Sequence, residues 1–273
     1  MKLAIYSDTH NEMVSSCEVD EEGKFYLPIF DHYKLPDNDD VDVIILAGDI
    51  HVGPNDGMVF ARRRWPTAKI IYVAGNHEFY RHHFQDTIAK MREAAKILDI
   101  HFFENDAVEI AGVRFLGTSL WTDFELYGAG EPADHAMQLA SRFINDFRKI
   151  GFGDEMRNMA PEDARELNVQ ARAFLRAELA KPFAGKTVVI THWLPHPDAI
   201  QERFVGDRLT PYFCCDCRDI MSDFPIDLWV FGHSHGSTDF VDTSGCRVLS
   251  NQMGYPHESP MATWFNESLV VEL

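Results

Sequence analysis

The stretch KLAIYSDTH, residues 2–10, joins an apolar, β-prone run directly to a cluster of polar side chains. Similar Val- and Ile-rich runs occupy residues 41–47, 69–74, 187–190 and 227–231. They end in Gly48-Asp49, Gly75-Asn76-His77-Glu78, Thr191-His192 and Gly232-His233-Ser234-His235. Runs that are apolar on both faces are typical of strands buried inside a sheet that is covered on both sides.

Helical patterns alternate with several of these runs. Residues 84–98 carry apolar side chains at helical spacing, residues 161–180 open with Pro161 and early acidic residues, and residues 134–150 form a third candidate helix. This alternation predicts a layered α/β fold. Additional strands are expected in 108–121, 246–251 and 268–273, partly paired as hairpins, with a tight turn at Ala111-Gly112.

The length of 273 residues suits one domain covering 1–273, with a helical excursion at about 122–180. The part between Thr122 and about Pro161 is rich in Gly and polar residues, and it either covers a site or packs on an edge. No apolar run approaches the ~18 residues that a membrane span needs. The N-terminus also lacks the apolar region of a signal peptide, so we expect a cytoplasmic location without membrane attachment.

The net charge of −18, from 43 acidic and 25 basic residues, argues against a protein that binds nucleic-acid polymers through a basic face. A bound metal could still attract an anion locally. The basic run Arg62–Arg64 is assigned to a helix end. Five cysteines without a secretory signal predict free thiols. We interpret Cys214, Cys215 and Cys217 as buried or incidental thiols in preference to a zinc site, because their spacing is not CxxC.

The polar clusters follow the carboxyl ends of predicted strands, where open α/β sheets bind ligands. If the strands are neighbours, one crevice collects Asp8, His10, Asp49, Asn76, His192, His233 and His235. Oxygen and nitrogen donors suit divalent Mn, Fe or Zn. Seven donors exceed what one ion takes, so we expect two ions that share one carboxylate, with Asp49 as the bridge. Two ions ~3.5–4 Å apart can hold a hydroxide at neutral pH and stabilise an in-line displacement.

The five clusters together resemble the ordered signature of calcineurin-like metallophosphoesterases: Asp-x-His, Gly-Asp, Gly-Asn-His-Glu, a lone His and Gly-His-x-His, here spread over residues 8–235. The resemblance implies an α/β fold, a four-layer α/β/β/α sandwich with two mixed sheets. It also implies that one ion is held by Asp8, His10, Asp49 and His235, and a second by Asp49, Asn76, His192 and His233. His77 would contact the phosphate or protonate the leaving oxygen, with Asp8 or Asp49 as candidates to orient it.

The resemblance implies a metal-dependent phosphoesterase in which a metal-bridging hydroxide attacks phosphorus, with Asn76 and His77 as catalytic residues. Small phosphodiesters are favoured as substrates, because no basic cluster marks a monoester site and a diester carries one fewer negative charge. Phosphomonoesterase and protein phosphatase activities remain alternatives. A non-catalytic interaction module is disfavoured by the intact ligand set, and a hydrolase of non-phosphate substrates by the Gly-Asn-His-Glu block. The sequence makes no prediction of oligomeric state.

Several further residues have two interpretations each. Trp193, where the family commonly has His or a small residue, either narrows the pocket or belongs to the core, and the core is preferred. Core packing is also preferred for Tyr80, Trp121 and Phe124 over a role as pocket wall. Among the remaining histidines, His51 is a candidate to support the ligands, His82 and His83 are expected to be exposed at a helix start, and His196 is a candidate substrate contact. The acidic residues 11–40 either form a rim or lie on the surface.

Overall fold

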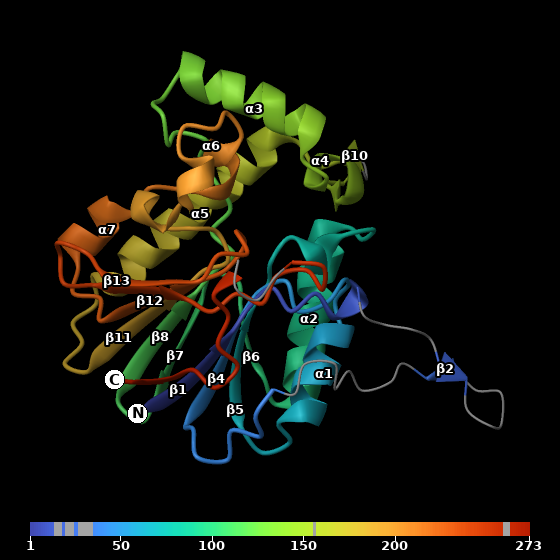
Figure 1. Cartoon of the computed structure of the whole chain (residues 1–273), viewed down its shortest axis with the longest axis vertical. Helices are drawn as coiled ribbons and strands as arrows, with labels where there is room; N and C mark the ends of the chain where they lie inside the picture. The colour runs from blue at the N-terminus through green and yellow to red at the C-terminus, as the bar shows by residue number, and fades with distance from the viewer. Residues whose placement is uncertain (14–17, 20–24, 27–34, 155–156, 259–262) are drawn as a thin grey trace.

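A computed structural model describes residues 1–13, 18–19, 25–26, 35–154, 157–258 and 263–273 of the chain. Two β-sheets lie face to face between outer layers of helices, and both chain ends lie at the same end of the sheets (Figure 1). Helices α3 (Glu131–Phe143) and α6 (Thr210–Phe213) lie over the opposite end, where most parallel strands terminate (Figure 1). The predicted α/β/β/α arrangement with two mixed sheets is confirmed.

The first sheet has the strand order β15-β1-β4-β5-β6. Its members are β15 (Val270–Glu272), β1 (Lys2–Tyr6), β4 (Val43–Ala47), β5 (Lys69–Val73) and β6 (His101–Phe103). Strands β1, β4, β5 and β6 run parallel, and β15 pairs antiparallel with β1. The predicted runs at 2–6, 41–47 and 69–74 therefore became neighbouring strands, and their carboxyl ends lie side by side.

The second sheet has the order β13-β14-β12-β11-β8-β7. Its members are β13 (Thr238–Val241), β14 (Arg247–Ser250), β12 (Leu228–Phe231), β11 (Lys186–Ile190), β8 (Val113–Gly117) and β7 (Asp106–Ile110). The edge strands β7 and β13 are antiparallel to their neighbours, and the inner strands are parallel. The turn between β7 and β8 contains Ala111 (φ 49°) and Gly112 (φ 77°), as the sequence predicts.

The alternation of side chains along each strand separates two buried layers. Leu3 and Ile5 of β1 pack in the layer between the sheets, together with Val188 and Ile190 of β11. Tyr6 points the other way, into the layer between the first sheet and its helices, where its ring stacks on Trp65 at 5.5 Å between ring centroids. Because the second sheet covers one face of these strands and helices cover the other, nearly every residue along them is apolar.

Helices α1 (Asp56–Arg64) and α2 (Phe84–Leu98) cover the outer face of the first sheet, and α5 (Pro161–Leu179) and α7 (Arg218–Asp223) cover that of the second (Figure 1). The predicted helices at 84–98 and 161–180 are confirmed. Arg62–Arg64 lie in the last turn of α1, as expected. Shorter helices are η1 (Asn11–Met13), η2 (His77–Phe79), η3 (Pro197–Ala199), η4 (Glu202–Phe204) and α6 (Thr210–Phe213).

The predicted helix at 134–150 is wrong in its bounds. α3 runs from Glu131 to Phe143, the backbone becomes extended at Ile144 (ψ 133°), and α4 covers only Asp146–Lys149. We attribute this break to a long-range contact, because Asp146 accepts a hydrogen bond from Asn76 Nδ2 (3.1 Å) at the carboxyl end of β5. The strands β9 (Gly151–Phe152) and β10 (Arg157–Asn158) follow, and β9 is tied to the residues before α2 through the Gly151 N–H and the His82 carbonyl (2.9 Å).

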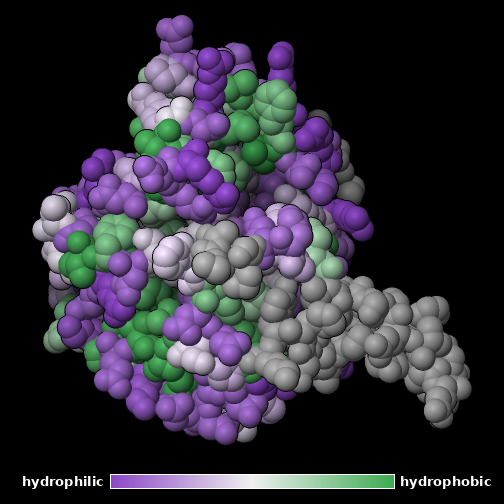
Figure 2. Space-filling model, viewed as in Figure 1, coloured by the Kyte–Doolittle hydropathy of each residue, from purple (hydrophilic) through white to green (hydrophobic). Residues whose placement is uncertain are grey.

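The segment from α3 to β10 therefore passes over the strand ends, from the second sheet to the first (Figure 1). On the face shown in Figure 2, hydrophobic side chains gather in this upper part of the molecule, over the region of α3 and α6. The exact division of the chain into one domain with an excursion at 122–180 stays a prediction. Of the segment 11–40, expected either as a rim or as a surface loop, the structure describes residues 11–13, the strand pair β2 (Glu18–Val19) and β3 (Phe25–Tyr26), and residues 35–40; the rest lies outside the described residues.

In the part of the chain that the structure describes, no helix combines the length and apolar character needed to span a membrane.

Candidate metal centre

The seven predicted ligand side chains lie together at the carboxyl ends of strands from both sheets. Asp8 and His10 follow β1, Asp49 follows β4 and Asn76 follows β5, whereas His192 follows β11 and the two remaining histidines follow β12. Six of the seven are buried, and His235 is half-buried. The two sheets thus contribute to one polar cluster, as the sequence predicts.

One group within the cluster consists of Asp8, His10 and His235, whose candidate ligand atoms all lie within 4.8 Å of one another. The Nε2 atoms of His10 and His235 are 2.9 Å apart. His235 Nε2 also lies 3.7 Å from Asp8 Oδ1. Two imidazole nitrogens and a carboxylate oxygen that converge in this way form a typical donor set for a divalent metal ion.

A second group consists of Asp49, His192 and His233, again with candidate ligand atoms within 4.8 Å. His192 Nε2 lies 3.5 Å from Asp49 Oδ2 and 3.2 Å from His233 Nδ1. Asp49 Oδ2 is also 3.9 Å from His10 Nε2 in the first group. The carboxylate of Asp49 therefore lies between the two groups.

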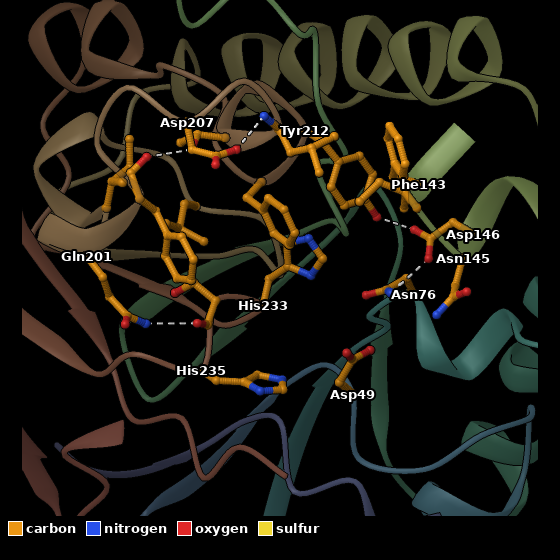
Figure 3. Close-up of a pocket in the computed structure, with 18 of the residues that line it drawn as sticks. Asp49, Asn76, Phe143, Asn145, Asp146, Gln201, Asp207, Tyr212, His233 and His235 are labelled. Atoms are coloured by element: carbon orange, nitrogen blue, oxygen red, sulfur yellow. Dashed lines mark hydrogen bonds between the residues drawn. The ribbon is translucent and has the colours of Figure 1, made fainter. Parts of the chain in front are cut away.

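Asn76 completes the second group through the orientation of its amide. Its Nδ2 donates to Tyr80 OH (3.1 Å) and to Asp146 Oδ1 (3.1 Å). Its buried Oδ1 has no hydrogen-bond partner, and His233 Nε2 is likewise buried without one. Figure 3 shows the Asn76 nitrogen turned to Asp146 and its oxygen turned to the side of His233. Since buried polar atoms normally have partners, the Asn76 oxygen fits a site that binds a metal ion. The His233 nitrogen that approaches the second group is Nδ1, 3.2 Å from His192 Nε2.

The backbone around the cluster adopts conformations that side chains rarely take. Left-handed φ values occur at Asp8 (53°), His10 (44°), Asp49 (56°), His233 (80°) and His235 (53°). Each such residue costs about 1–2 kcal/mol relative to a relaxed backbone. Glycine would relieve this strain, so its absence at these positions indicates that the side chains themselves are required.

Glycines occur instead where the chain has no room for a side chain. A Cβ on Gly75 would collide with Asp49 Oδ1 and would lie 2.7 Å from His192 Cε1. A Cβ on Gly48, which has φ 87°, would lie 2.6 Å from the backbone N of Gly75. The glycines of these two blocks therefore let the ends of β4 and β5 meet beside His192.

Two carboxylates hold the blocks in register. Glu78, fully buried, accepts hydrogen bonds from the backbone N–H groups of Asp49 (3.1 Å), Ile50 (2.9 Å) and Gly75 (2.8 Å), and from Tyr72 OH (2.7 Å). Asp8 accepts the backbone N–H of His233 at 2.9 Å, which connects the two sheets. The last residue of the Gly-Asn-His-Glu block thus supports the ligands rather than facing the cavity.

Hydrogen-bond contacts on the side away from the cluster fix which ring nitrogen of His192 and of His235 faces the other candidate ligands. His192 Nδ1 lies 2.8 Å from the Ala47 carbonyl, and His235 Nδ1 lies 2.7 Å from Glu258 Oε2. Both contacts leave Nε2 as the inward atom, an arrangement that is usual for metal-binding histidines. Burial would raise the pKa of Asp49, but the charges of His192 and His77 hold it well below the ordinary value, so this carboxylate is ionised and able to bind a cation.

His77 lies beside the cluster and is oriented by a residue that the sequence did not indicate. Its Nδ1 lies 2.7 Å from Glu12 Oε1, whereas Asp49 Oδ2 is 4.0 Å from its Nε2. Neither of the two expected aspartates therefore orients the ring. Burial lowers the pKa of His77, but Asp49 and Glu12 together raise it to about 9. Tyr255 OH lies 3.4 Å from His77 Nε2, so a phenol also faces this position.

A cavity of about 460 Å³ opens above the cluster, with Asp49, Asn76, His77, His233 and His235 at its floor (Figure 3). Asp146, at the start of α4, reaches this floor: it accepts hydrogen bonds from Asn76 Nδ2, from Tyr80 OH (2.8 Å) and from Tyr212 OH. Through Asp146, α4 thus contacts Asn76, one of the candidate metal-binding residues, directly. Glu12, Asp146 and Tyr255 were all missed by sequence reasoning, because none belongs to a motif.

The aromatic residues singled out in the sequence divide into core and cavity. Trp193 is fully buried, stacks on Trp121 at 4.3 Å between ring centroids, and donates from Nε1 to the Tyr212 carbonyl (2.9 Å). The preference for the core is confirmed for these two residues and for the buried Phe124. For Tyr80 that preference was incomplete, since its side chain also lines the cavity.

The four other histidines named from the sequence lie outside the cluster. His51 Nδ1 contacts the Val52 carbonyl (2.8 Å), and His196 accepts the backbone N–H of Asp198 (3.0 Å) as the cap of η3. His196 is absent from the described residues that line the cavity, so its role as a substrate contact stays a prediction without support from the structure. His82 is exposed as predicted. His83 is not, because it is half-buried with Nε2 2.8 Å from the Gly153 carbonyl.

The cysteine cluster is a set of buried free thiols, as preferred from the sequence. Cys215 Sγ accepts a hydrogen bond from Asn168 Nδ2 (3.2 Å), and Arg172 Nη1 contacts Cys217 Sγ (3.3 Å). Within the described part of the chain, the groups of side chains that could hold a metal ion contain no cysteine.

Residues 1–237 match the family model of calcineurin-like phosphoesterases. An uncharacterized protein of Acanthamoeba polyphaga mimivirus is 26% identical over 94% of this chain and 92% of its own length. A phosphopantetheinyl hydrolase from Mycobacterium tuberculosis has a similar structure, with a TM-score of 0.64, 17% identity and coverage of 96% of this chain and 94% of that one. A dimetal phosphatase from Danio rerio gives a TM-score of 0.50, 14% identity and coverage of 96% and 90%. Both structures share the fold of this chain.

Proposed function

We propose that this chain, which belongs to the calcineurin-like phosphoesterase family and is a hydrolase of phosphoric esters, uses two divalent metal ions to cleave small phosphodiesters. The observation that carries the proposal is the position of Asp49 between two groups of metal-ligating side chains. Its Oδ2 lies 3.9 Å from His10 Nε2 on one side and 3.5 Å from His192 Nε2 on the other.

In this proposal each group holds one ion, and Asp49 belongs to both. The first ion takes Asp8, His10, Asp49 and His235, and the second takes Asp49, Asn76, His192 and His233. Two divalent ions in these positions would supply an activated water and would neutralise charge on the phosphoryl oxygens. Mn, Fe and Zn all suit this mixture of nitrogen and oxygen donors.

The chain's own residues then position the ester and handle the proton. Glu12 holds Nδ1 of His77, so Nε2 faces the cavity and can deliver a proton to the leaving oxygen. Burial raises the pKa of Tyr255 above its ordinary value, so the phenol keeps its proton and can donate a hydrogen bond to a phosphoryl oxygen. Asp146 and Tyr80 keep the Asn76 oxygen turned inward.

The preference for diesters rests on charge. Among the described residues that line the cavity there is no lysine or arginine, although Lys149 and Arg203 pack against the rings of the lining residues Tyr80 and Phe204. A monoester dianion would meet no cationic side chain among these lining residues. A diester carries one fewer charge and needs less compensation. Phosphomonoesters and phosphoproteins are the alternative substrates.

The test is a panel of phosphate esters assayed on chelator-stripped protein that is reloaded separately with Mn, Fe, Ni or Zn. We expect metal-dependent hydrolysis of bis-p-nitrophenyl phosphate, with a kcat/KM above that of p-nitrophenyl phosphate. A reversed order would make the protein a phosphomonoesterase. Hydrolysis of neither ester with any of the metals would favour a non-catalytic module on this fold.

A further inference from the structure

The cavity beyond the metal centre has apolar walls from two separate parts of the chain. Phe143 and Ile144, at the end of α3, form one wall, and Phe204, Leu209 and Phe213, around η4 and α6, form the other. Figure 3 shows Phe143 beside Tyr212 and Asp146, on the side of the cavity opposite Gln201 and Asp207. These walls stand above the polar floor that Asn76 and His233 help to form.

Three of the polar side chains that line the cavity, those of Gln201, Asp207 and Asp146, already have hydrogen-bond partners within the protein. Gln201 Nε2 donates to the Ser234 carbonyl (2.9 Å), and Asp207 Oδ1 accepts the Leu209 backbone N–H (2.8 Å). Asp146 accepts its hydrogen bonds from Asn76, Tyr80 and Tyr212. Arg203 lies over the Phe204 ring, 4.7 Å from its centroid, but it is not among the described lining residues. A charged group entering between the walls would therefore lose its hydration without a cationic partner in the lining itself, which is costly.

The dimensions fit an ester arm of moderate size. The cavity of about 460 Å³ lies within the roughly 300–1,000 Å³ typical of small-molecule sites, and the phosphate itself needs only the floor. At the mouth, Phe143 is 61% exposed and Phe204 is 41% exposed. Large apolar side chains exposed next to a cavity are a common mark of ligand contact.

We propose that the walls formed by Phe143, Ile144, Phe204, Leu209 and Phe213 bind an uncharged apolar arm of the substrate. The substrate class is then a phosphodiester with one alkyl or aryl arm. This inference rests on the proposed function, because it places the phosphodiester group on the metal centre. The metal ligands set the reaction, and these walls set which ester is cleaved.

The first test is a series of 4-nitrophenyl alkyl phosphates, from methyl to hexyl, assayed on the metal-loaded protein. Burial of each added methylene should raise kcat/KM by about threefold, or about 240-fold across the five methylenes that separate methyl from hexyl. The ω-carboxyalkyl ester that matches the hexyl ester in length should be at least about tenfold poorer than that ester. A flat series, or a preference for the carboxylate, would overturn this inference alone. Absence of metal-dependent hydrolysis of every ester would instead refute the proposed function.

The second test places a cation in the wall. Phe204→Lys and Phe143→Lys change partly exposed residues, so both variants should fold, which circular dichroism checks. Each should lower the hexyl-to-methyl ratio by about tenfold and raise activity toward the carboxyalkyl ester. Ile97→Lys on α2, where Ile97 is 78% exposed, is the matched control and should leave both ratios within about twofold. Unchanged ratios in both wall variants would contradict the inference.

Discussion

The floor and the walls of the same cavity are built differently. The floor consists of polar residues at strand ends, several with strained backbone. Backbone N–H groups of these segments donate hydrogen bonds to the carboxylates of Glu78 and Asp8 and so hold them in place. The walls come from short helices and loops, and they keep apolar side chains partly exposed at the mouth. Substitutions in the floor should therefore abolish the reaction, whereas substitutions in the walls should redirect it to other esters.

The largest effect is expected at Asp49, because this residue belongs to both groups of ligands. Asp49→Asn removes the negative charge that lies between them, and kcat should fall by about 10⁴-fold or more. Metal content by ICP mass spectrometry should drop below two equivalents per chain. Asp86→Asn, on the exposed first turn of α2, is the control and should keep both activity and metal. Two tightly held equivalents in Asp49→Asn would disprove the shared position.

The next largest effect is expected at His77, which lies at the floor without belonging to either proposed ligand set. His77→Ala should keep its metal and lose about 10²–10⁴-fold in kcat, the usual contribution of a positioned proton donor. Kinetics and metal analysis on the same preparation separate the two roles. Full activity in this variant would rule out His77 as the acid, and loss of metal would make it a ligand.

A smaller effect is expected at Glu12, which orients His77. Glu12→Gln should lower kcat by about 10–100-fold, as is typical for residues that support a functional histidine. In the metal-free protein, NMR should show His77 titrating near pH 9 in the wild type and at lower pH in the variant. An unchanged titration would mean that Glu12 does not govern the ring.

The same pair gives a signed dependence of metal-free stability on pH. The pKa of His77 is raised from 6.5 to about 9, so its contribution is complete below pH 6.5 and is lost as the pH rises through about 9. Hydrogen bonds from His10 and His77 outweigh burial and lower the pKa of Glu12 from 4.5 to about 2, so its contribution is lost as the pH falls through about 2. Urea titrations should show the Glu12→Gln penalty shrinking at both extremes.

The smallest effect is expected at Asp146, where wall and floor meet. Asp146→Asn replaces one acceptor oxygen with a donor that faces the Asn76 amide or a tyrosine hydroxyl, so the Asn76 oxygen should be less well held. We expect metal affinity to weaken by about tenfold, measured by competition with a chelator. Asp134→Asn on the exposed face of α3 is the control. Unaltered metal affinity would show that Asp146 does not support metal binding through Asn76.

The floor could be predicted from the sequence, because each of its motifs directly follows an apolar run that identifies a strand. Parallel strands bring their carboxyl ends together, so the blocks at Asp8, Asp49 and Asn76 had to meet once the sheet was correct. The walls and supports were not predictable in this way. Asp146 lies 70 positions from Asn76, and its contact depends on the path of α3 across the sheets. The apolar spacing at 134–150 gave no sign of the break that this contact imposes.

The most direct test is anomalous diffraction from crystals of the Mn-loaded protein, recorded on both sides of the Mn absorption edge. Our account predicts two peaks in the cluster, one ligated by Asp8, His10 and His235, the other by Asn76, His192 and His233, with Asp49 contacting both. A single peak, or peaks that share a residue other than Asp49, would contradict it.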